Sequence, residues 1–305
     1  MNQLPVWIDG DPGVDDAAAI IVAHDREELQ VVALSTVAGN APLDITTRNA
    51  LCLCQMLGAE YPVYRGASAP LMRQYHDGTE FHGEDGMGGV NLPDPSRRAE
   101  SIAAWDAIYE AAKKYEGKLE VVAMGPLTNI ALALSKYPDL KDMVNRIAIM
   151  GGSITRGNRT PCAEYNIFAD PEAAQIVFRS GAKIVMCGLE VTEKAYLTPE
   201  ELENLRKSEK GEFYYRASKQ ILEKNLESGH EGFCIHDVCP VLFLAKEEMF
   251  QGELAGVFVE TQAELSLGKT VCDLYSDKQF DEKNTFVVLD VDRNAFVEAV
   301  SRAFA

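Results

Sequence analysis

Short apolar runs alternate with helical patterns along most of this chain, and this alternation limits the fold more than any other feature. The apolar runs are Val6–Asp9, Gln30–Val37, Leu119–Ala123, Arg146–Met150, Lys183–Cys187 and Thr285–Val291. Helical patterns lie between them near Asp15–His24, Leu43–Leu57, Ala99–Tyr115, Leu127–Lys136 and Pro171–Ser180. Strands that are almost entirely apolar need cover on both faces, and crossover helices supply it. The sequence therefore predicts an α/β fold with an open, mostly parallel sheet and helices on both faces. The strand order does not follow from this pattern.

Length and composition allow a sizeable core. The chain has 305 residues, of which 47% are hydrophobic, and this is enough for one large domain or two small ones. Two stretches interrupt the alternation: one near 73–95 that is rich in Gly, Pro and charge, and one of charged helices that ends near 224–233. Long connections of this kind often cover a site. We therefore expect a single domain over residues 1–305, with mobile loops near 73–95 and 224–233.

The charge balance restricts the partners. The chain has 47 acidic residues against 29 Lys plus Arg, a formal net charge of -18. Nucleic acids and anionic membranes bind basic patches, so neither is an expected partner. The composition instead fits a protein that binds a neutral or cationic small molecule.

The cysteines and the N-terminal segment indicate the compartment. The seven cysteines are an odd number and include no C-x-x-C pair, so we expect reduced thiols. Asp9 and Asp11 interrupt the first apolar stretch, which argues against a signal peptide. No apolar run approaches the length of a membrane span. A cytoplasmic location is expected.

Three aspartates lie where the first apolar run meets the first helical pattern. The segment reads Asp9-Gly10-Asp11-Pro12-Gly13-Val14-Asp15-Asp16-Ala17. Acids in the first turn of a helix can simply favour its dipole, which explains one or two of them better than three plus Asp9. Like charges this close repel unless a cation joins them, and carboxylate oxygens suit Ca²⁺ or Mg²⁺. We predict a divalent metal bound by Asp11, Asp15 and Asp16 at a strand-to-helix junction.

Further polar segments follow other strands. They are Gly39-Asn40, Met124-Gly125-Pro126, a loop with Asn158, Glu164 and Asn166, and His236-Asp237 before an apolar helix. The carboxyl ends of strands are where open α/β sheets bind ligands. Amides and carboxylates suit sugar hydroxyls, and a histidine suits proton transfer. Each segment also has a plainer interpretation, as an ordinary turn, a solvated loop or a helix cap.

Taken together, these segments resemble the nucleoside hydrolases, the inosine–uridine-preferring N-ribohydrolase family. The most specific element is the run from Asp9 to Ala17. It is followed, in order, by Val37-Ala38-Gly39-Asn40, His82-Gly83-Glu84-Asp85-Gly86-Met87-Gly88, Gly125-Pro126-Leu127-Thr128-Asn129-Ile130-Ala131, Met150-Gly151-Gly152, Ala163-Glu164-Tyr165-Asn166 and His236-Asp237. The similarity covers nearly the whole chain, and the order of the segments makes it specific.

The resemblance implies a nucleoside-hydrolase-like fold that cleaves the N-glycosidic bond of ribonucleosides to free base and ribose. It implies a Ca²⁺ held by Asp11, Asp16, Asp237 and the backbone oxygen of Met124. Asp11 would also take the proton of a metal-bound water, and His236 would lie beside the leaving base. This chemistry is coherent, because a cation lowers the pKa of its water and nearby acids favour positive charge on the sugar.

The same resemblance implies the substrate contacts. They are Asp15 and Asn166 for the 2′- and 3′-hydroxyls, Asn40 and Met150 near the ribose, Asn158 and Glu164 at the 5′ end, and His82 closing over the base. The segment Lys224–Phe233 lacks an obvious aromatic residue for the base, a role that His230 or Phe233 could fill. A pyrimidine-preferring or broad specificity is therefore expected. The family also implies a homo-oligomer, either a tetramer or a dimer.

Two other functions fit parts of the sequence. Asp9-x-Asp11 after an apolar strand resembles the nucleophile and acid of Mg²⁺ phosphatases of the haloacid dehalogenase type, but this leaves the pair Asp15 and Asp16 unexplained. A catalytically silent nucleoside-binding protein is the non-enzymatic alternative. Phosphate release from a nucleotide would favour the first, and binding without turnover would favour the second.

Overall fold

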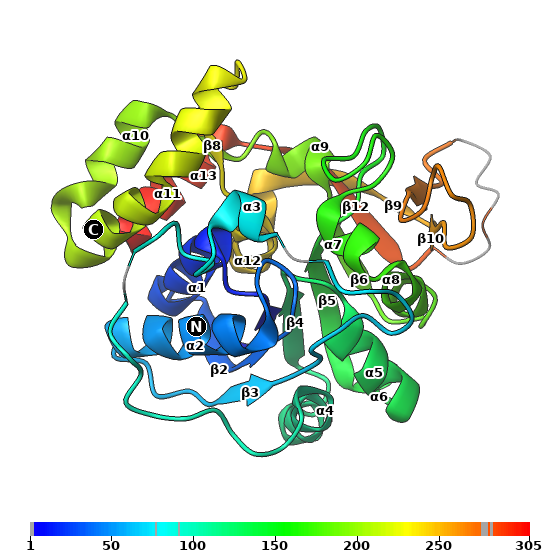
Figure 1. Ribbon diagram of the computed structural model, residues 1–305. Helices are drawn as coiled ribbons and strands as arrows, with labels where there is room; N and C mark the ends of the chain where they lie inside the picture. Colours follow the sequence, from blue (N-terminus) through cyan, green and yellow to red (C-terminus); the bar gives the residue numbers. More distant parts are fainter. Residues whose placement is uncertain (1–2, 77, 91, 276–279, 281–282) are drawn as a thin grey trace.

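The computed structural model describes residues 3–76, 78–90, 92–275, 280 and 283–305 (Figure 1). An eight-stranded sheet forms its centre, in the order β3-β2-β1-β4-β5-β6-β12-β9. Its strands are β1 Leu4–Gly10, β2 Leu29–Thr36, β3 Val63–Arg65, β4 Leu119–Ala123, β5 Val144–Met150, β6 Ile184–Cys187, β9 Phe250–Ala255 and β12 Thr285–Val291. Every neighbouring pair in this sheet is parallel except β9 with β12. The predicted mostly parallel sheet is confirmed.

The remaining strands form two small antiparallel pairs, and helices fill most of the connections. The pairs are β7 Tyr196–Leu197 with β8 Phe233–Cys234, and β10 Val257–Val259 with β11 Thr270–Cys272. The α-helices are α1 Val14–Asp25, α2 Leu43–Met56, α3 Thr79–His82, α4 Ala104–Tyr115, α5 Thr128–Lys136, α6 Leu140–Met143, α7 Tyr165–Ala169, α8 Pro171–Phe178, α9 Leu189–Thr192, α10 Pro199–Asn204, α11 Glu209–Glu227, α12 Val238–Ala245 and α13 Arg293–Ala303. Two 3₁₀ turns, η1 Leu205–Lys207 and η2 Glu247–Met249, complete the described elements.

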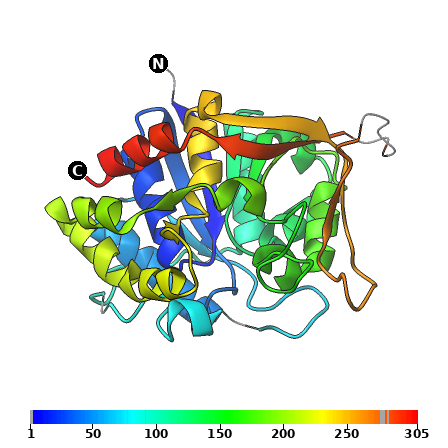
Figure 2. The same cartoon turned by 90° about the horizontal axis from the view of Figure 1, so that it is seen from above.

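Helices cover both faces of the sheet, as Figures 1 and 2 show. Helices α1, α2, α11, α12 and α13 share one apolar core, and α4, α5 and α8 share another. Successive side chains of a strand point to opposite faces, so Ile8 enters the first core and Trp7 the second. Each central strand is therefore apolar on both faces, which is the origin of the apolar runs in the sequence.

The structure differs from the sequence prediction in several elements. Strand β3 has only three residues, and β9 is an edge strand with polar, exposed positions, so neither produces an apolar run. Helix α13 was also not predicted. The helix predicted from Ala99 begins at Ala104, because Glu100 instead pairs with the strand at Val63 and Tyr64. These differences leave the predicted architecture intact.

Within the described part of the chain, no helix combines the length and apolar character that crossing a membrane requires. All seven cysteines are free thiols, as predicted.

Candidate active site

The fold brings three loops together at one point of the sheet. Strand β1 lies between β2 and β4, so the chain proceeds from β1 in one direction to β2 and β3, and later in the other direction to β4, β5 and β6. Asp11, Asn40 and Met124 follow β1, β2 and β4 at the same carboxyl edge. Such a reversal of strand order opens a crevice where α/β proteins bind ligands. The topology therefore explains why these three loops converge.

The side chain of Asp11 is buried in a cradle of backbone. The backbone N–H of Asn40 donates to its Oδ2 at 2.6 Å. A Cβ atom on Gly125 would lie 2.6 Å from its Oδ1, and one on Gly39 would collide with Oδ2. Glycine is therefore needed at both positions because the backbone approaches the carboxylate too closely for a side chain. Its Oδ1 is buried and has no hydrogen-bond partner among the described residues.

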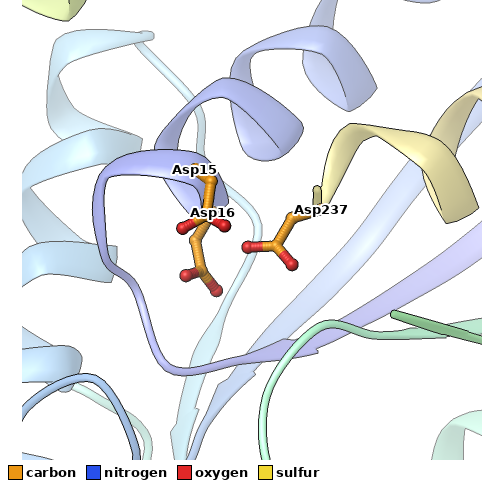
Figure 3. Close-up of side chains that lie close together, drawn as sticks. All are labelled: Asp15, Asp16 and Asp237. Atoms are coloured by element: carbon orange, nitrogen blue, oxygen red, sulfur yellow. The ribbon is translucent and has the colours of Figure 1, made fainter. Parts of the chain in front are cut away.

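A compact acidic cluster lies beside Asp11. Asp15 and Asp16 come from the first turn of α1, and Asp237 immediately precedes α12 (Figure 3). Each supplies an oxygen within 4.8 Å of the others. This cluster contains Asp15 but not the predicted ligand Asp11. Asp11 instead contacts Asp16 through its backbone, since Asp11 N donates to Asp16 Oδ1 at 3.2 Å. The fold thus brings together carboxylates from two segments that are far apart in the sequence.

Burial and mutual repulsion oppose ionisation of Asp11, Asp16 and Asp237. Desolvation, and then the charges of Asp16 and Asp15, raise the pKa of Asp11 well above its usual range. Desolvation and the charge of Asp15 raise the pKa of Asp16 to about 7. The pKa of Asp237 is raised well above its usual range by desolvation and by the other three acids, and its carboxyl shares a hydrogen bond with Asp16. That hydrogen bond requires a proton on one of the two groups.

These residues fit a hard divalent cation. A cation would replace the shared proton and relieve the repulsion. Asp15 Oδ1, like Asp11 Oδ1, is buried and unpartnered among the described residues, so oxygens remain for coordination. The group therefore has both the donor type and the electrostatic need for a metal ion.

Two of the four acids, Asp15 and Asp237, line a cavity of about 640 Å³. Most predicted site residues line it: Asp15, Asn40, His82, Met124, Met150, Asn158, Glu164, Asn166, His236 and Asp237. Asp11 and Asp16 are fully buried and lie outside this lining. The structure thus brings the predicted residues to one cavity, and a nucleoside-sized ligand would fit its volume.

Three predicted residues come from the segment between β5 and α8. Asn166 Nδ2 donates to the carbonyl oxygens of Met124 at 2.8 Å and Met150 at 3.1 Å. The Glu164 carboxylate caps α7 and also accepts from Gly152 N at 2.9 Å. Burial raises its pKa to about 7, against these hydrogen bonds. Asn158 is exposed, and its Oδ1 accepts from a backbone N–H.

Two histidines also line the cavity. Val14 N donates to His82 Nδ1 at 3.4 Å, and His82 is 8% exposed at the end of α3. His236 Nδ1 lies 2.8 Å from Thr192 Oγ1. Desolvation lowers the pKa of both imidazoles below its usual value, which favours the neutral form of each ring.

Asp9 has a different environment. It is fully buried, and Ser35 Oγ and Asn129 Nδ2 donate to its Oδ1, the latter at 2.7 Å. It does not line the cavity. A haloacid-dehalogenase-type phosphatase would need this carboxylate as its nucleophile, so the structure argues against that alternative.

Comparison with known proteins identifies the family. The family model described as "Inosine-uridine preferring nucleoside hydrolase" matches residues 6–298. The chain belongs to the nucleoside hydrolase family. Among its relatives, the "Non-specific ribonucleoside hydrolase RihC" of Escherichia coli O139:H28 is 42% identical over 304 residues, which cover 99% of each chain. The same enzyme of Shigella boydii serotype 18 is also 42% identical over 304 residues, with 99% of each chain covered.

Solved nucleoside hydrolases have the same fold. A plant nucleoside hydrolase superimposes with a TM-score of 0.92 at 30% identity, covering 99% of each chain. The purine-preferring ribonucleoside hydrolase of Gardnerella vaginalis has a TM-score of 0.93 at 31% identity, covering 98% of each chain. The predicted family, fold and enzyme class are confirmed.

Sequence reasoning did not identify several other residues of this nucleoside hydrolase cavity. They are Gly78, Arg156, Arg159, Tyr165, Glu193, Lys224, Asn225 and Cys234. His230 lines the cavity, whereas Phe233 is 3% exposed and packs in the core near Tyr214, so Phe233 was a wrong candidate for the base contact. Phe233 is buried because β8 pairs with β7, and no pattern in the sequence predicts this pairing.

Proposed function

We propose that this nucleoside hydrolase cleaves the N-glycosidic bond of ribonucleosides by attack of water at the anomeric carbon, with Ca²⁺ as its cofactor. The observation that carries the proposal is the carboxylate cluster of Asp15, Asp16 and Asp237 beside a cavity of about 640 Å³. The relatives named as ribonucleoside hydrolases support the same substrate class.

Four groups would hold the Ca²⁺: the carboxylates of Asp11, Asp16 and Asp237 and the backbone oxygen of Met124. All are oxygen donors, which Ca²⁺ prefers. When bound, the ion supplies Lewis acidity that lowers the pKa of a water. The carbonyl of Met124 already accepts from Asn166 Nδ2, and a carbonyl oxygen has a second lone pair for another partner.

The cavity offers matched groups for the sugar. Asp15 and Asn166 would bind the 2′- and 3′-hydroxyls, with Asn40 and Met150 beside the ring. Asn158 and Glu164 would bind the 5′ end. Because Glu164 Oε1 and Oε2 already accept backbone N–H groups, it acts as a hydrogen-bond acceptor of fixed position.

Two side chains would move or hold protons during the reaction. Asp11 accepts the proton of the attacking water as the oxygen bonds to C1′. The bond between C1′ and the base nitrogen breaks, and its electron pair leaves with the base. His236, on the cavity wall, donates a hydrogen bond to the departing base, where negative charge develops. The acids near the ribose favour the positive charge that develops on the sugar.

The base end of the cavity suits a broad specificity, with pyrimidines included. Polar side chains that line the cavity include Arg156, Lys224, Asn225 and His230, and we assign these four to the base end. Such groups can bond to the edges of several bases. The relative named as non-specific supports the broad alternative.

Two segments over the cavity would close on the substrate as mobile loops of a single domain. Gly78 and His82 line the cavity from the first, near 73–95, and Lys224, Asn225 and His230 from the second, near 224–233. Residues 77 and 91 of the first segment lie outside the described residues. Closure would bring His82 over the base and exclude water.

The cellular context is proposed on simpler grounds. Free cysteines, seven in all, suit a cytoplasmic enzyme. Assembly into a dimer or tetramer is expected from the family resemblance, and light scattering on the purified protein would measure it.

A panel of nucleosides tests the proposed function. Inosine, uridine, cytidine and adenosine are incubated with the enzyme and Ca²⁺, and free ribose is measured. The proposal predicts ribose and free base in equal amounts from several of these substrates. Binding of intact nucleoside with no ribose release would support the silent binding protein, and phosphate release from nucleotides alone would support the phosphatase.

A further inference from the structure

Helix α9 lies beside the loop that carries His236, because the strand that follows α9 pairs with the strand that precedes His236. Strand β7, which comes after α9, pairs antiparallel with β8, which precedes His236. Ile235 N donates to Ala195 O at 3.0 Å, next to this pair. The two backbones are therefore fixed to each other at the point where Thr192, the last residue of α9, meets the imidazole.

Thr192 makes the one described side-chain hydrogen bond of His236. Its Oγ1 lies 2.8 Å from Nδ1, while Nε2 has no hydrogen-bond partner among the described residues. Thr192 is fully buried and does not line the cavity, whereas His236 does. Thr192 therefore contacts the imidazole on the side away from the cavity and cannot contact a substrate in the cavity itself.

The direction of this hydrogen bond follows from the burial of the hydroxyl. If Nδ1 carried the hydrogen, Thr192 Oγ1 would accept it, and its own O–H would need an acceptor elsewhere. Within the described chain, Oγ1 has no other partner. A buried donor without an acceptor is costly, whereas an unused lone pair on a hydroxyl oxygen is tolerated. The O–H of Thr192 therefore donates to Nδ1.

A neutral imidazole has one nitrogen with a hydrogen and one without. Acceptance of a hydrogen bond at Nδ1 places the ring hydrogen on Nε2. We propose that Thr192 is a positioning residue that holds His236 as the Nε2–H tautomer, so that Nε2 donates to the departing base. The effect on the departing base rests on the proposed function, but the tautomer of His236 is a property of the protein without substrate.

The partner of the histidine thereby determines which bases can leave easily. Without the hydroxyl, the ring is free to take the other tautomer or to rotate, and Nε2 then offers a lone pair to the base. A lone pair does not stabilise the negative charge that develops there. Poor leaving groups, such as natural bases, need the donor, and an activated leaving group such as p-nitrophenol does not.

Thr192→Val tests the inference, because valine keeps the shape and removes the hydroxyl. We expect kcat on uridine and inosine to fall about ten- to a hundredfold, with KM little changed. The rate on p-nitrophenyl riboside should stay close to that of the unchanged enzyme. Thr192→Ser restores the hydroxyl and should recover most of the nucleoside activity.

Thr285→Val is the matched control. Thr285 is also fully buried, but its Oγ1 has no hydrogen-bond partner in the described structure, so the same substitution should leave both substrates unaffected. Equal loss on both substrates for Thr192→Val, or failure of Thr192→Ser to recover activity, would overturn the inference.

Nitrogen NMR of the unchanged protein, labelled at histidine, measures the tautomer directly and does not depend on any variant at Thr192. The His236→Gln spectrum identifies the signals. We expect a hydrogen on Nε2 and a bare Nδ1, and a hydrogen on Nδ1 would refute the assignment. If the protein shows the Nε2–H tautomer but releases no ribose from any nucleoside, the proposed function fails and the positioning by Thr192 stands.

Discussion

Asp16 and Asp237 place carboxylate oxygens within 4.8 Å of each other, although they are far apart in the sequence. Asp16 lies in the first turn of α1, and Asp237 comes immediately before α12. Helices α1 and α12 pack in the same apolar core, which fixes this approach. Packing of the two helices therefore holds repelling carboxylates close together. The proposed Ca²⁺ would bind between them and relieve this repulsion.

Substitution of Asp11 should remove both a metal ligand and the proposed base. For Asp11→Ala, we expect kcat to fall by roughly 10²- to 10⁴-fold from loss of the base alone, and further if the ion is lost. Ribose release from uridine measures this. Asp290→Asn, at an exposed side chain of β12 that does not line the cavity, should keep normal activity. Near-normal turnover in Asp11→Ala would show that another group activates the water.

Removal of the metal should abolish activity and reduce stability together. Dialysis against EDTA should inactivate the enzyme slowly, and added Ca²⁺ should restore it. Because the ion binds only the folded state, a thousandfold excess over its Kd should stabilise the fold by about 4 kcal/mol. Thermal unfolding with and without Ca²⁺ measures this gain. Full activity of protein shown by elemental analysis to be metal-free would contradict the proposal.

The buried acids predict an unusual dependence of stability on pH. Burial and the charge of Asp15 raise the pKa of Asp16 from 3.8 to about 7, so the metal-free folded state binds more protons than the unfolded state between these values. Stability of the metal-free protein should therefore fall as the pH rises from about 4 to 7. Calcium binding displaces these protons, so the affinity of the protein for Ca²⁺ should rise as the pH increases from about 4 to 7.

Titration calorimetry of Ca²⁺ binding at several pH values, in buffers of different ionisation enthalpy, measures the protons released. Asp237→Asn removes one coupled carboxyl and should release fewer of them. A calcium affinity that does not vary between pH 5.5 and pH 8 would be inconsistent with shared protons in the cluster.

His236→Ala should distinguish between leaving groups. Loss of the donor should slow cleavage of uridine and inosine by roughly 10²- to 10⁴-fold and affect p-nitrophenyl riboside far less. His24→Ala is the control, since His24 lies in the last turn of α1 near Tyr61 and does not line the cavity. The same fractional loss on all substrates would assign His236 a role in folding or binding instead.

Gly125→Ala tests the backbone cradle of Asp11. Its Cβ would lie 2.6 Å from Asp11 Oδ1, so the carboxylate must move. Overpacking should cost about 1–3 kcal/mol of stability, and activity should fall strongly because the base is displaced. Gly117→Ala provides the comparison: its φ is 79° and its Cβ would meet nothing within 4 Å, so it should lower stability but spare kcat.

Local sequence predicted much of this site because its acids are local. Asp11, Asp15 and Asp16 follow one strand and begin one helix, so their meeting needs no knowledge of the rest of the fold. Asp237 could be added only through the family resemblance, since no local pattern links it to the N-terminal acids. The strand order that explains the meeting of Asn40 and Met124 was likewise unavailable from periodicity.

The sequence did not predict contacts between segments that are far apart along the chain. The pairing of β7 with β8, each of two residues, buries Phe233 and brings Thr192 to His236, and such short strands leave no periodic signal. Arg156 and Glu193 form an ion pair at 2.8 Å on the cavity wall from two loops that the sequence does not connect. Side chains of this kind are found only once the fold is known.

A crystal structure of the protein grown with Ca²⁺ tests the central claim most directly, because anomalous scattering identifies the ion and its ligands. The account predicts one Ca²⁺ bonded to carboxylate oxygens of Asp11, Asp16 and Asp237 and to the carbonyl oxygen of Met124. Only water among these oxygens at saturating Ca²⁺, or an ion bound without Asp237, would contradict it.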